Sequence, residues 1–330
     1  MTRFPRLAAR AVALATMLLW LMSGANAYAA GAPARAQVLG VDAFWLTVSS
    51  LDRSLLFYHD VLGLALIPAT PASSRLAILQ GLTATPGSRI RTETLSAGAG
   101  TPLRLLEFSN ARHRVLHPHA VDPGAALLQV QVRDLDTVLT AAARAHVSIV
   151  TRGGAPLRLA DGTRSIVLTD PDGFFVAVSE PPPGAPDSAP AATTLTVRYT
   201  VAAPATLVRF YRQTLGITLA NGNFGDMGPW AVLLNARGAQ QAVTAGRGLG
   251  GVQFLAFRRV PRHTYSGRPQ DPGTPELSLR VANLRVALNA VRAAGVRVLS
   301  AGGQPVVLPD GGAAVLFRDP AGLLINLVQP

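Results

Sequence analysis

The stretch AFWLTVSSLDRSLLFYHDVLG, residues 43–63, decides the fold of this chain. Its first six residues alternate between two faces, as in a β-strand, with Phe44, Leu46 and Val48 on one face and Ala43, Trp45 and Thr47 on the other. Ser50 can cap an amphipathic helix that follows at once, and Gly63 suits the left-handed residue after its end. The stretch therefore predicts a strand, a short turn and a helix.

An internal repeat extends this unit over the whole chain. Residues 108–180 align with residues 257–329 without a gap, at an offset of 257 − 108 = 149. Ahead of that segment FYHDVLG at Phe57 matches FYRQTLG at Phe210, at an offset of 210 − 57 = 153. The proline-rich seam suits an extended linker at 182–193. We therefore predict two similar halves, 38–181 and 194–330.

Each half contains two strand–helix units. Alternating strands are predicted near 127–132, 196–201 and 276–281, each followed by a helix and then by about three short strands. On all four first strands one face is apolar, whereas the other carries polar or aromatic side chains. A helix can cover the apolar face, and the opposite face of two such sheets can form a cup for a small molecule.

The N-terminus has the pattern of a secretory signal peptide, which we place at residues 1–29. Arginines precede a short apolar run at 11–22, and small residues follow at 25–29. The run is shorter than the roughly 20 residues that a membrane helix needs. We expect a periplasmic or secreted protein without stable membrane insertion after cleavage; an uncleaved N-terminal anchor is the alternative.

Composition excludes several kinds of chemistry. The chain has no cysteine and no lysine, so thiolate nucleophiles, sulfur metal sites and lysine Schiff bases are excluded. The formal net charge of +12 comes from scattered arginines without interleaved aromatic residues. We therefore expect no nucleic-acid partner.

The stretch at 43–64 and the endings TDPDGFFVAVSEP and RDPAGLLINLVQP resemble the vicinal oxygen chelate (VOC) superfamily. This superfamily includes glyoxalase I, bleomycin resistance proteins, epimerases and extradiol dioxygenases. The resemblance covers nearly all of residues 38–330. It implies an α+β fold of tandem glyoxalase-like domains, each with two βαβββ modules that form a cup-shaped sheet. Whether modules pair within a half or between halves stays open.

The resemblance also implies where a divalent metal would bind, on the first and last strands of each module. Grouped by half, the first cup offers Ala43, Arg104, Leu127 and Ala177, and the second offers Thr196, Gln253, Glu276 and Asn326. Only the second set contains a carboxylate, and neither contains an imidazole. We therefore expect degenerate metal ligands, with Gln253, Glu276 and Asn326 as the candidates if one divalent metal is bound in domain 2.

Other inward-facing residues suggest binding. They could supply an aromatic surface, amide hydrogen bonds and arginine contacts to an anion. We predict that the ligand-binding residues are Trp45, Gln129, Gln131, Arg198, Ser278 and Arg280. Arg280 could instead pair with Glu276 on the same strand. The pair His117 and His119 fits a solvated loop better than a metal site.

Three functions remain open on the sequence. The first is an exported protein that binds a small, anionic or aromatic molecule in its cups. The second is a metal-dependent lyase, isomerase, epimerase or dioxygenase that uses the second cup, with Glu276 as catalytic residue. The third is an interaction protein whose modules pair, as a monomer or a homodimer.

Overall fold

The computed structural model describes residues 36–68, 75–98, 100–184 and 192–330, and residues 36–330 form one compact unit. The predicted signal peptide and most of the predicted linker lie outside the described residues. Within the described parts of the chain, no helix is long and apolar enough to cross a membrane.

The first half folds as two modules in which a strand and a helix precede three strands. Module 1 consists of β1 (Val38–Val48), α2 (Leu51–Leu55) with its π-helical continuation η1 (Leu56–Val61), β2 (Ala65–Ile67), α3 (Arg75–Thr83), β3 (Arg89–Ser96) and β4 (Leu103–Ser109). Module 2 consists of β5 (Ala126–Val132), α4 (Leu135–Arg144), β6 (Leu157–Arg158), β7 (Arg164–Thr169) and β8 (Phe175–Glu180).

The second half repeats this order. Module 3 consists of β9 (Ala192–Thr200), α5 (Pro204–Thr214), β10 (Ala220–Asn221), β11 (Gly225–Asp226), α6 (Trp230–Leu233), β12 (Gln240–Ala245) and β13 (Val252–Arg258). Module 4 consists of β14 (Pro275–Val281), α7 (Leu284–Ala293), η2 (Ala301–Gly303), β15 (Val306–Val307), β16 (Ala313–Arg318) and β17 (Leu324–Gln329). The predicted α+β fold of βαβββ modules is confirmed.

Local signals behave as their chemistry predicts. The side chain of Ser50 accepts a hydrogen bond from the backbone N–H of Arg53 at the start of α2. Gly63 follows η1 with φ 74°, and Pro204 occupies the first turn of α5.

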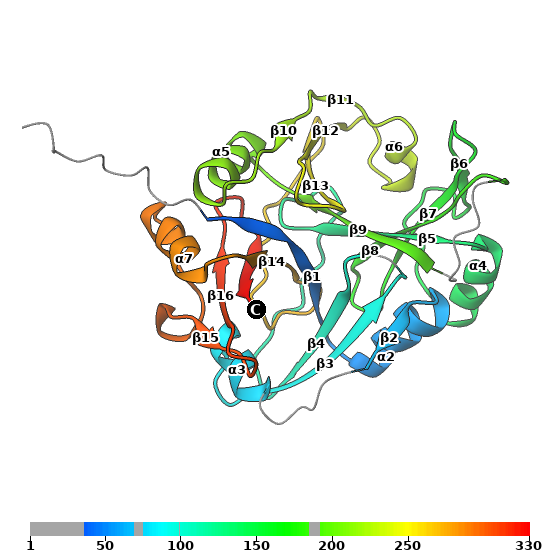
Figure 1. The fold of residues 1–330 in the computed structure, drawn as a ribbon. Helices are drawn as coiled ribbons and strands as arrows, with labels where there is room; N and C mark the ends of the chain where they lie inside the picture. Colours follow the sequence, from blue (N-terminus) through cyan, green and yellow to red (C-terminus); the bar gives the residue numbers. More distant parts are fainter. Residues whose placement is uncertain (1–35, 69–74, 99, 185–191) are drawn as a thin grey trace, which may run out of the picture. The chain divides into compact units, whose positions relative to one another are not determined.

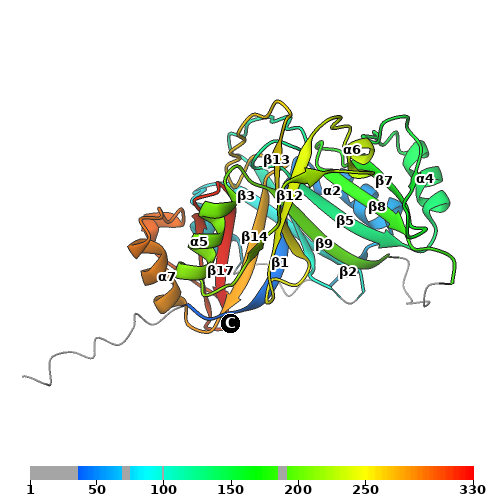
Figure 2. The ribbon, with the colours of Figure 1, turned by 90° about the horizontal axis from the view of Figure 1, so that it is seen from above.

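The modules pair between the halves. In the eight-stranded sheet the order is β15-β16-β17-β14-β1-β4-β3-β2, so module 4 continues into module 1 through the antiparallel pair β1–β14. Figure 1 shows β1, near the start of the described chain, beside β14 from its second half. In the nine-stranded sheet the order is β10-β12-β13-β9-β5-β8-β7-β6, so module 3 continues into module 2 (Figure 2). Our grouping of candidate residues into one cup per half is therefore wrong.

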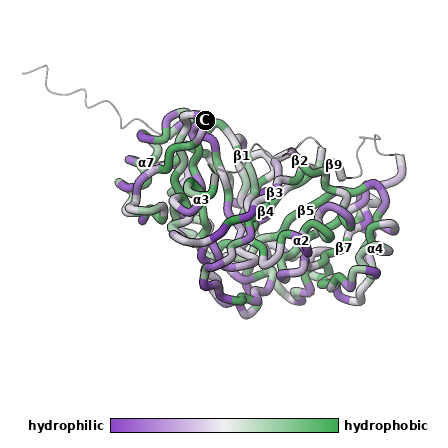
Figure 3. The backbone as a smooth tube through the Cα atoms, turned by 90° about the horizontal axis from the view of Figure 1, so that it is seen from below, coloured by the Kyte–Doolittle hydropathy of each residue, from purple (hydrophilic) through white to green (hydrophobic). Residues whose placement is uncertain are grey.

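The apolar faces of both sheets share one large core. It contains strand residues of all four modules, among them Phe44, Leu128, Val197 and Leu277, together with helix residues such as Leu207 and Leu288. Figure 3 shows hydrophobic segments toward the interior, while hydrophilic segments gather on outer loops. Burial of this apolar surface is the main stabilising contribution to the fold.

Contacts between a helix of one module and the strands or turns of the other also join the two modules within each half. The hydroxyl of Tyr58 in η1 donates a hydrogen bond of 2.9 Å to Oδ2 of Asp170, at the turn between β7 and β8. In the second half Phe210 of α5 packs against Phe317 of β16, with ring centroids 6.2 Å apart. Each module thus contacts one module through its sheet and another through its helix, and the halves are interlocked.

Candidate functional site

Polar side chains gather on the face of the eight-stranded sheet that lies away from the main core. We call this face cup A; it carries a smaller apolar cluster that includes Ala43, Trp45, Leu106, Leu316 and Leu324. Because strand residues alternate between faces, Phe44 and Leu46 point into the main core while Trp45 points into cup A. Trp45 is 4% exposed, so the cup is closed over it.

Strand register brings residues from four strands together at the centre of cup A. Trp45 on β1 lies opposite Glu276 on β14 and beside Arg104 on β4. On the other side, Ser278 on β14 lies beside Asn326 on β17. Modules 1 and 4 therefore both contribute to this constellation.

A pocket of about 240 Å³ opens at three of these residues, Trp45, Arg104 and Asn326. Trp45, Arg104 and Asn326 line its sheet side, and Leu79 and Leu82 of α3 line its cover. The loop after β15 closes another side with Leu308 and neighbouring residues. We did not predict α3 as a cover from the sequence; the helical spacing of its apolar residues Ile78, Leu79 and Leu82 is the signal that could have revealed it.

Arg104 supplies the positive charge of cup A. Its guanidinium carbon lies 4.9 Å from the centroid of the Trp45 ring, within the range of a cation–π contact. Burial raises the pKa of the Glu276 carboxyl to about 8, and the nearby positive charge of Arg104 opposes this shift. At pH 7 the protonated form of Glu276 is therefore favoured in the folded protein.

A short hydrogen-bonded chain borders the pocket. Asn326 Nδ2 donates to Ser278 Oγ at 3.3 Å, and Ser278 Oγ donates to Asp42 Oδ2 at 3.0 Å. Three further buried polar atoms, Trp45 Nε1, Glu276 Oε1 and Asn326 Oδ1, have no hydrogen-bond partner among the described residues. Such atoms cost free energy unless a ligand or water satisfies them.

The structure separates several residues that we had grouped. Gln253 lies on β13 of the nine-stranded sheet, whereas Glu276 and Asn326 lie on the eight-stranded sheet, so these three do not form one metal site. Arg280 lies near the end of β14 and is exposed, without an ion pair to Glu276. The grouping is wrong because β13 pairs with β9 and not with β14.

The remaining predicted residues lie on cup B, the face of the nine-stranded sheet that carries Leu127, Ala177 and Leu255. The side chains of Gln129, Gln131, Arg198 and Gln253 belong to this face by strand alternation. Thr196 Oγ1 donates to Gln129 Oε1 at 3.3 Å. The segment around α6 covers cup B, with Leu233 and Leu234 in its apolar cluster.

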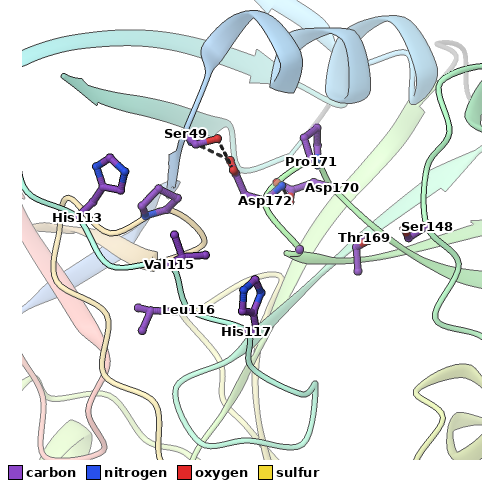
Figure 4. A pocket seen from close by; sticks show the side chains of 12 residues that line it. Ser49, His113, Val115, Leu116, His117, Ser148, Thr169, Asp170, Pro171 and Asp172 are labelled. Carbon is purple, nitrogen blue, oxygen red and sulfur yellow. Dashed lines mark hydrogen bonds between the residues drawn. The ribbon is translucent and has the colours of Figure 1, made fainter.

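A second pocket, of about 430 Å³, shares no lining residue with the pocket of cup A, and Figure 4 shows the side chains around it. It is lined by residues that include Ser49, His113, His117 and Asp172. The backbone N–H of Ser49 donates to Asp172 Oδ2 at 2.8 Å, and the Ser49 hydroxyl donates to the other oxygen. His119 does not line this pocket; its ring lies 3.3 Å from Asp122.

Metal-ligand chemistry is sparse in both cups. In the described parts of the chain, no group of three or more His, Cys, Asp or Glu side chains is arranged to hold a metal ion. With the observed pairing, the positions that correspond to metal ligands are Ala43, Arg104, Glu276 and Asn326 in cup A, and Leu127, Ala177, Thr196 and Gln253 in cup B.

Comparison with known families matches each half. Residues 40–178 match the family model described as the Glyoxalase/Bleomycin resistance protein/Dioxygenase superfamily, and residues 194–328 match a glyoxalase-like domain. A search of curated proteins finds no match.

Solved structures share the fold at low sequence identity. Glyoxalase I from Zea mays is 15% identical with a TM-score of 0.56, over 89% of this chain and 92% of its own. A point mutant of that enzyme is 16% identical with a TM-score of 0.57, over 89% and 94%. A putative dioxygenase from Bacillus subtilis is 15% identical with a TM-score of 0.52, over 89% and 86%.

Proposed function

Because the chain belongs to the glyoxalase/bleomycin resistance protein/dioxygenase (vicinal oxygen chelate) superfamily, with two such domains in tandem, we propose that it binds a small molecule in cup A without a metal ion. The observation that carries this proposal is the 240 Å³ pocket lined by Trp45 and Asn326, whose buried atoms Nε1 and Oδ1 lack partners among the described residues. A polar ligand would satisfy those atoms, and the pocket suits a compound of modest size.

The donor set of cup A does not fit a divalent metal. Glu276 is the single carboxylate at the four corresponding positions, and a lone carboxylate without an imidazole holds a divalent cation weakly. Arg104 brings a fixed positive charge to the same place, and it would repel a cation. Ala43 offers no ligand atom. We infer that Arg104 supplies the positive charge that a metal supplies in the superfamily.

The chemistry of the walls indicates the class of ligand. Trp45 offers a flat apolar surface and a ring N–H donor, and Asn326 Oδ1 offers an acceptor. Arg104 favours a ligand that carries a negative or strongly polar oxygen. These features support a small, planar, anionic or aromatic compound.

The proposal includes export. It rests on the arginine-flanked apolar run and the small residues at 25–29, which lie outside the described part of the chain. Fractionation of the native host, with N-terminal sequencing of the purified protein, tests this part. A mature N-terminus near residue 30 outside the cytoplasm supports export, and an intact N-terminus in the cytoplasm contradicts it.

Ligand binding is tested by a thermal-shift screen of small carboxylates and heteroaromatic compounds against EDTA-treated protein. At least one compound is expected to raise Tm in a saturable way. Its Kd should weaken by about tenfold or more in Arg104→Gln, as expected for loss of a charged contact worth about 1.5–3 kcal/mol. The matched control is Arg212→Gln, on the exposed face of α5. If no compound raises Tm, or if both variants bind alike, the proposal fails.

The raised pKa of Glu276 favours a second candidate, a metal-independent enzyme in which Glu276 transfers a proton. A carboxyl with a pKa of about 8 can both donate and accept protons near neutral pH. With a ligand in hand, Glu276→Gln would keep binding but lose turnover by 100-fold or more, the usual range for a general acid or base. Equal turnover in Glu276→Gln and wild type would rule this candidate out.

A further inference from the structure

We propose that cup B is a second binding site, specific for a small carboxylate that Arg198 holds beneath Trp230. Both residues belong to module 3, on β9 and α6. The site is separate from the pocket of cup A because the two lie on different sheets. This inference does not depend on the function proposed for cup A.

Arg198 is a partly buried cation without a counter-ion. Its guanidinium carbon lies 4.4 Å from the centroid of the Trp230 ring. Its Nε atom is buried and has no hydrogen-bond partner in the described structure. No carboxylate of the described residues contributes to its pKa, which burial alone lowers to about 10. A buried charge of this kind is costly unless an opposite charge joins it.

Cup B differs from cup A in the groups that surround its arginine. Both cups place an arginine against a tryptophan, at 4.9 Å in cup A and 4.4 Å in cup B. In cup A a carboxyl group, that of Glu276, lies near Arg104. At the floor positions of cup B the chain has Leu127, Ala177, Thr196 and Gln253, which carry no charge. A bound anion is therefore the partner that this site lacks among the described residues.

Neighbouring groups define the rest of the ligand. Gln253 lies beside Arg198 in the β13–β9 register, and its buried Oε1 has no partner among the described residues. Leu127 lies on the other side of Arg198, opposite it on β5. A carboxylate can take the guanidinium N–H groups in a paired arrangement. A hydroxyl or amino group on the same molecule can donate to Gln253, so a hydroxy- or amino-substituted small carboxylate fits best.

The α6 segment provides the cover of this site. Leu233 and Leu234 pack against the sheet within the apolar cluster of cup B. The backbone N–H of Arg152 in module 2 donates to the carbonyl of Val232 at 3.1 Å, so α6 is tied to the opposite module. Arg198 Nε is shielded from solvent and its guanidinium lies against the Trp230 ring, so Trp230 would report a ligand that binds there.

Trp230 fluorescence tests the proposal in the full chain. The chain has three tryptophans, so Trp20→Phe with Trp45→Phe leaves Trp230 as the only one. Formate, acetate, lactate, glycine and benzoate are titrated, with chloride as the ionic-strength control. We expect a saturable change in Trp230 emission with at least one carboxylate, and a Kd at least tenfold weaker in Arg198→Gln. No saturable change, or an equal Kd in Arg198→Gln, overturns the proposal.

A stability measurement keeps the test independent of any one compound. Without added anion, Arg198→Gln should have a higher Tm than the parent because it removes an uncompensated buried charge. Carboxylates should then raise the Tm of the parent but not of the variant. Arg104→Gln, in cup A, should retain the carboxylate effect on Trp230. A lower Tm in Arg198→Gln, together with an unchanged carboxylate effect, would show that Arg198 has a structural role only.

Discussion

The substitution Glu276→Gln gives the most quantitative prediction, because it removes a titrating group while it keeps the shape of the side chain. Glu276 is 5% exposed, and burial raises its pKa from 4.5 to about 8. In the unfolded chain the carboxyl ionises near pH 4.5, whereas in the folded protein it keeps its proton until about pH 8. The unfolded state therefore binds fewer protons over this range, and stability falls as pH rises.

The size of the effect follows from the two pKa values. At about 1.4 kcal/mol per pH unit, a range of pH 4.5 to about 8 corresponds to a loss of up to about 5 kcal/mol. Above pH 8 no further loss is expected. Glu276→Gln lacks this loss, so its stability relative to wild type should increase from pH 4.5 to pH 8.

Urea denaturation at pH 4.5, 6, 7 and 8.5 measures the difference. Asp170 and Asp319 also have raised pKa values, about 7 and about 6, but both proteins carry them, so their effects cancel in the comparison. A stability difference that does not change with pH would refute the reasoning, because it would show that Glu276 ionises in the folded protein as it does in water.

Two further predictions concern the fold. Gly124 has φ 99°, and a Cβ there would collide with the backbone carbonyl of Tyr265. Gly124→Ala should therefore lower the free energy of unfolding, measured in urea, by more than about 3 kcal/mol. The control is Gly153→Ala, which has φ 89° and open space around it and should cost only about 1–2 kcal/mol. Equal losses of stability in the two variants would contradict the clash. Residues 36–184 produced alone lack β14 and β9, so sedimentation should show a dimer or larger species, and a compact folded monomer would contradict the interlocked arrangement.

The four modules could be predicted from the sequence, but which modules pair with one another could not. Alternation in residues 43–48 and the helix stripe after them are local patterns, and the structure reproduces them. The pairing of β1 with β14 depends on which edges meet in three dimensions, and two similar halves offer equivalent edges. No local pattern distinguishes pairing within a half from pairing between halves.

The candidate site depended on this pairing. Trp45, Glu276, Ser278 and Asn326 were each predicted, but they meet only because module 1 joins module 4. Arg104 was identified only as a position unable to bind a metal, and its role beside Trp45 and Glu276 follows from the register of β1 and β4. The covers α3 and α6 lie within long connections whose path over the cups is set by tertiary packing.

The most direct test of metal-free binding in cup A combines elemental analysis with calorimetry on one preparation. The protein is purified from cells supplied with Mn, Fe, Ni and Zn, and a compound found in the thermal-shift screen is titrated before and after treatment with EDTA. We expect less than about 0.1 equivalent of any transition metal and the same Kd in both titrations. About one equivalent of one metal, lost in Glu276→Ala together with ligand binding, would contradict it.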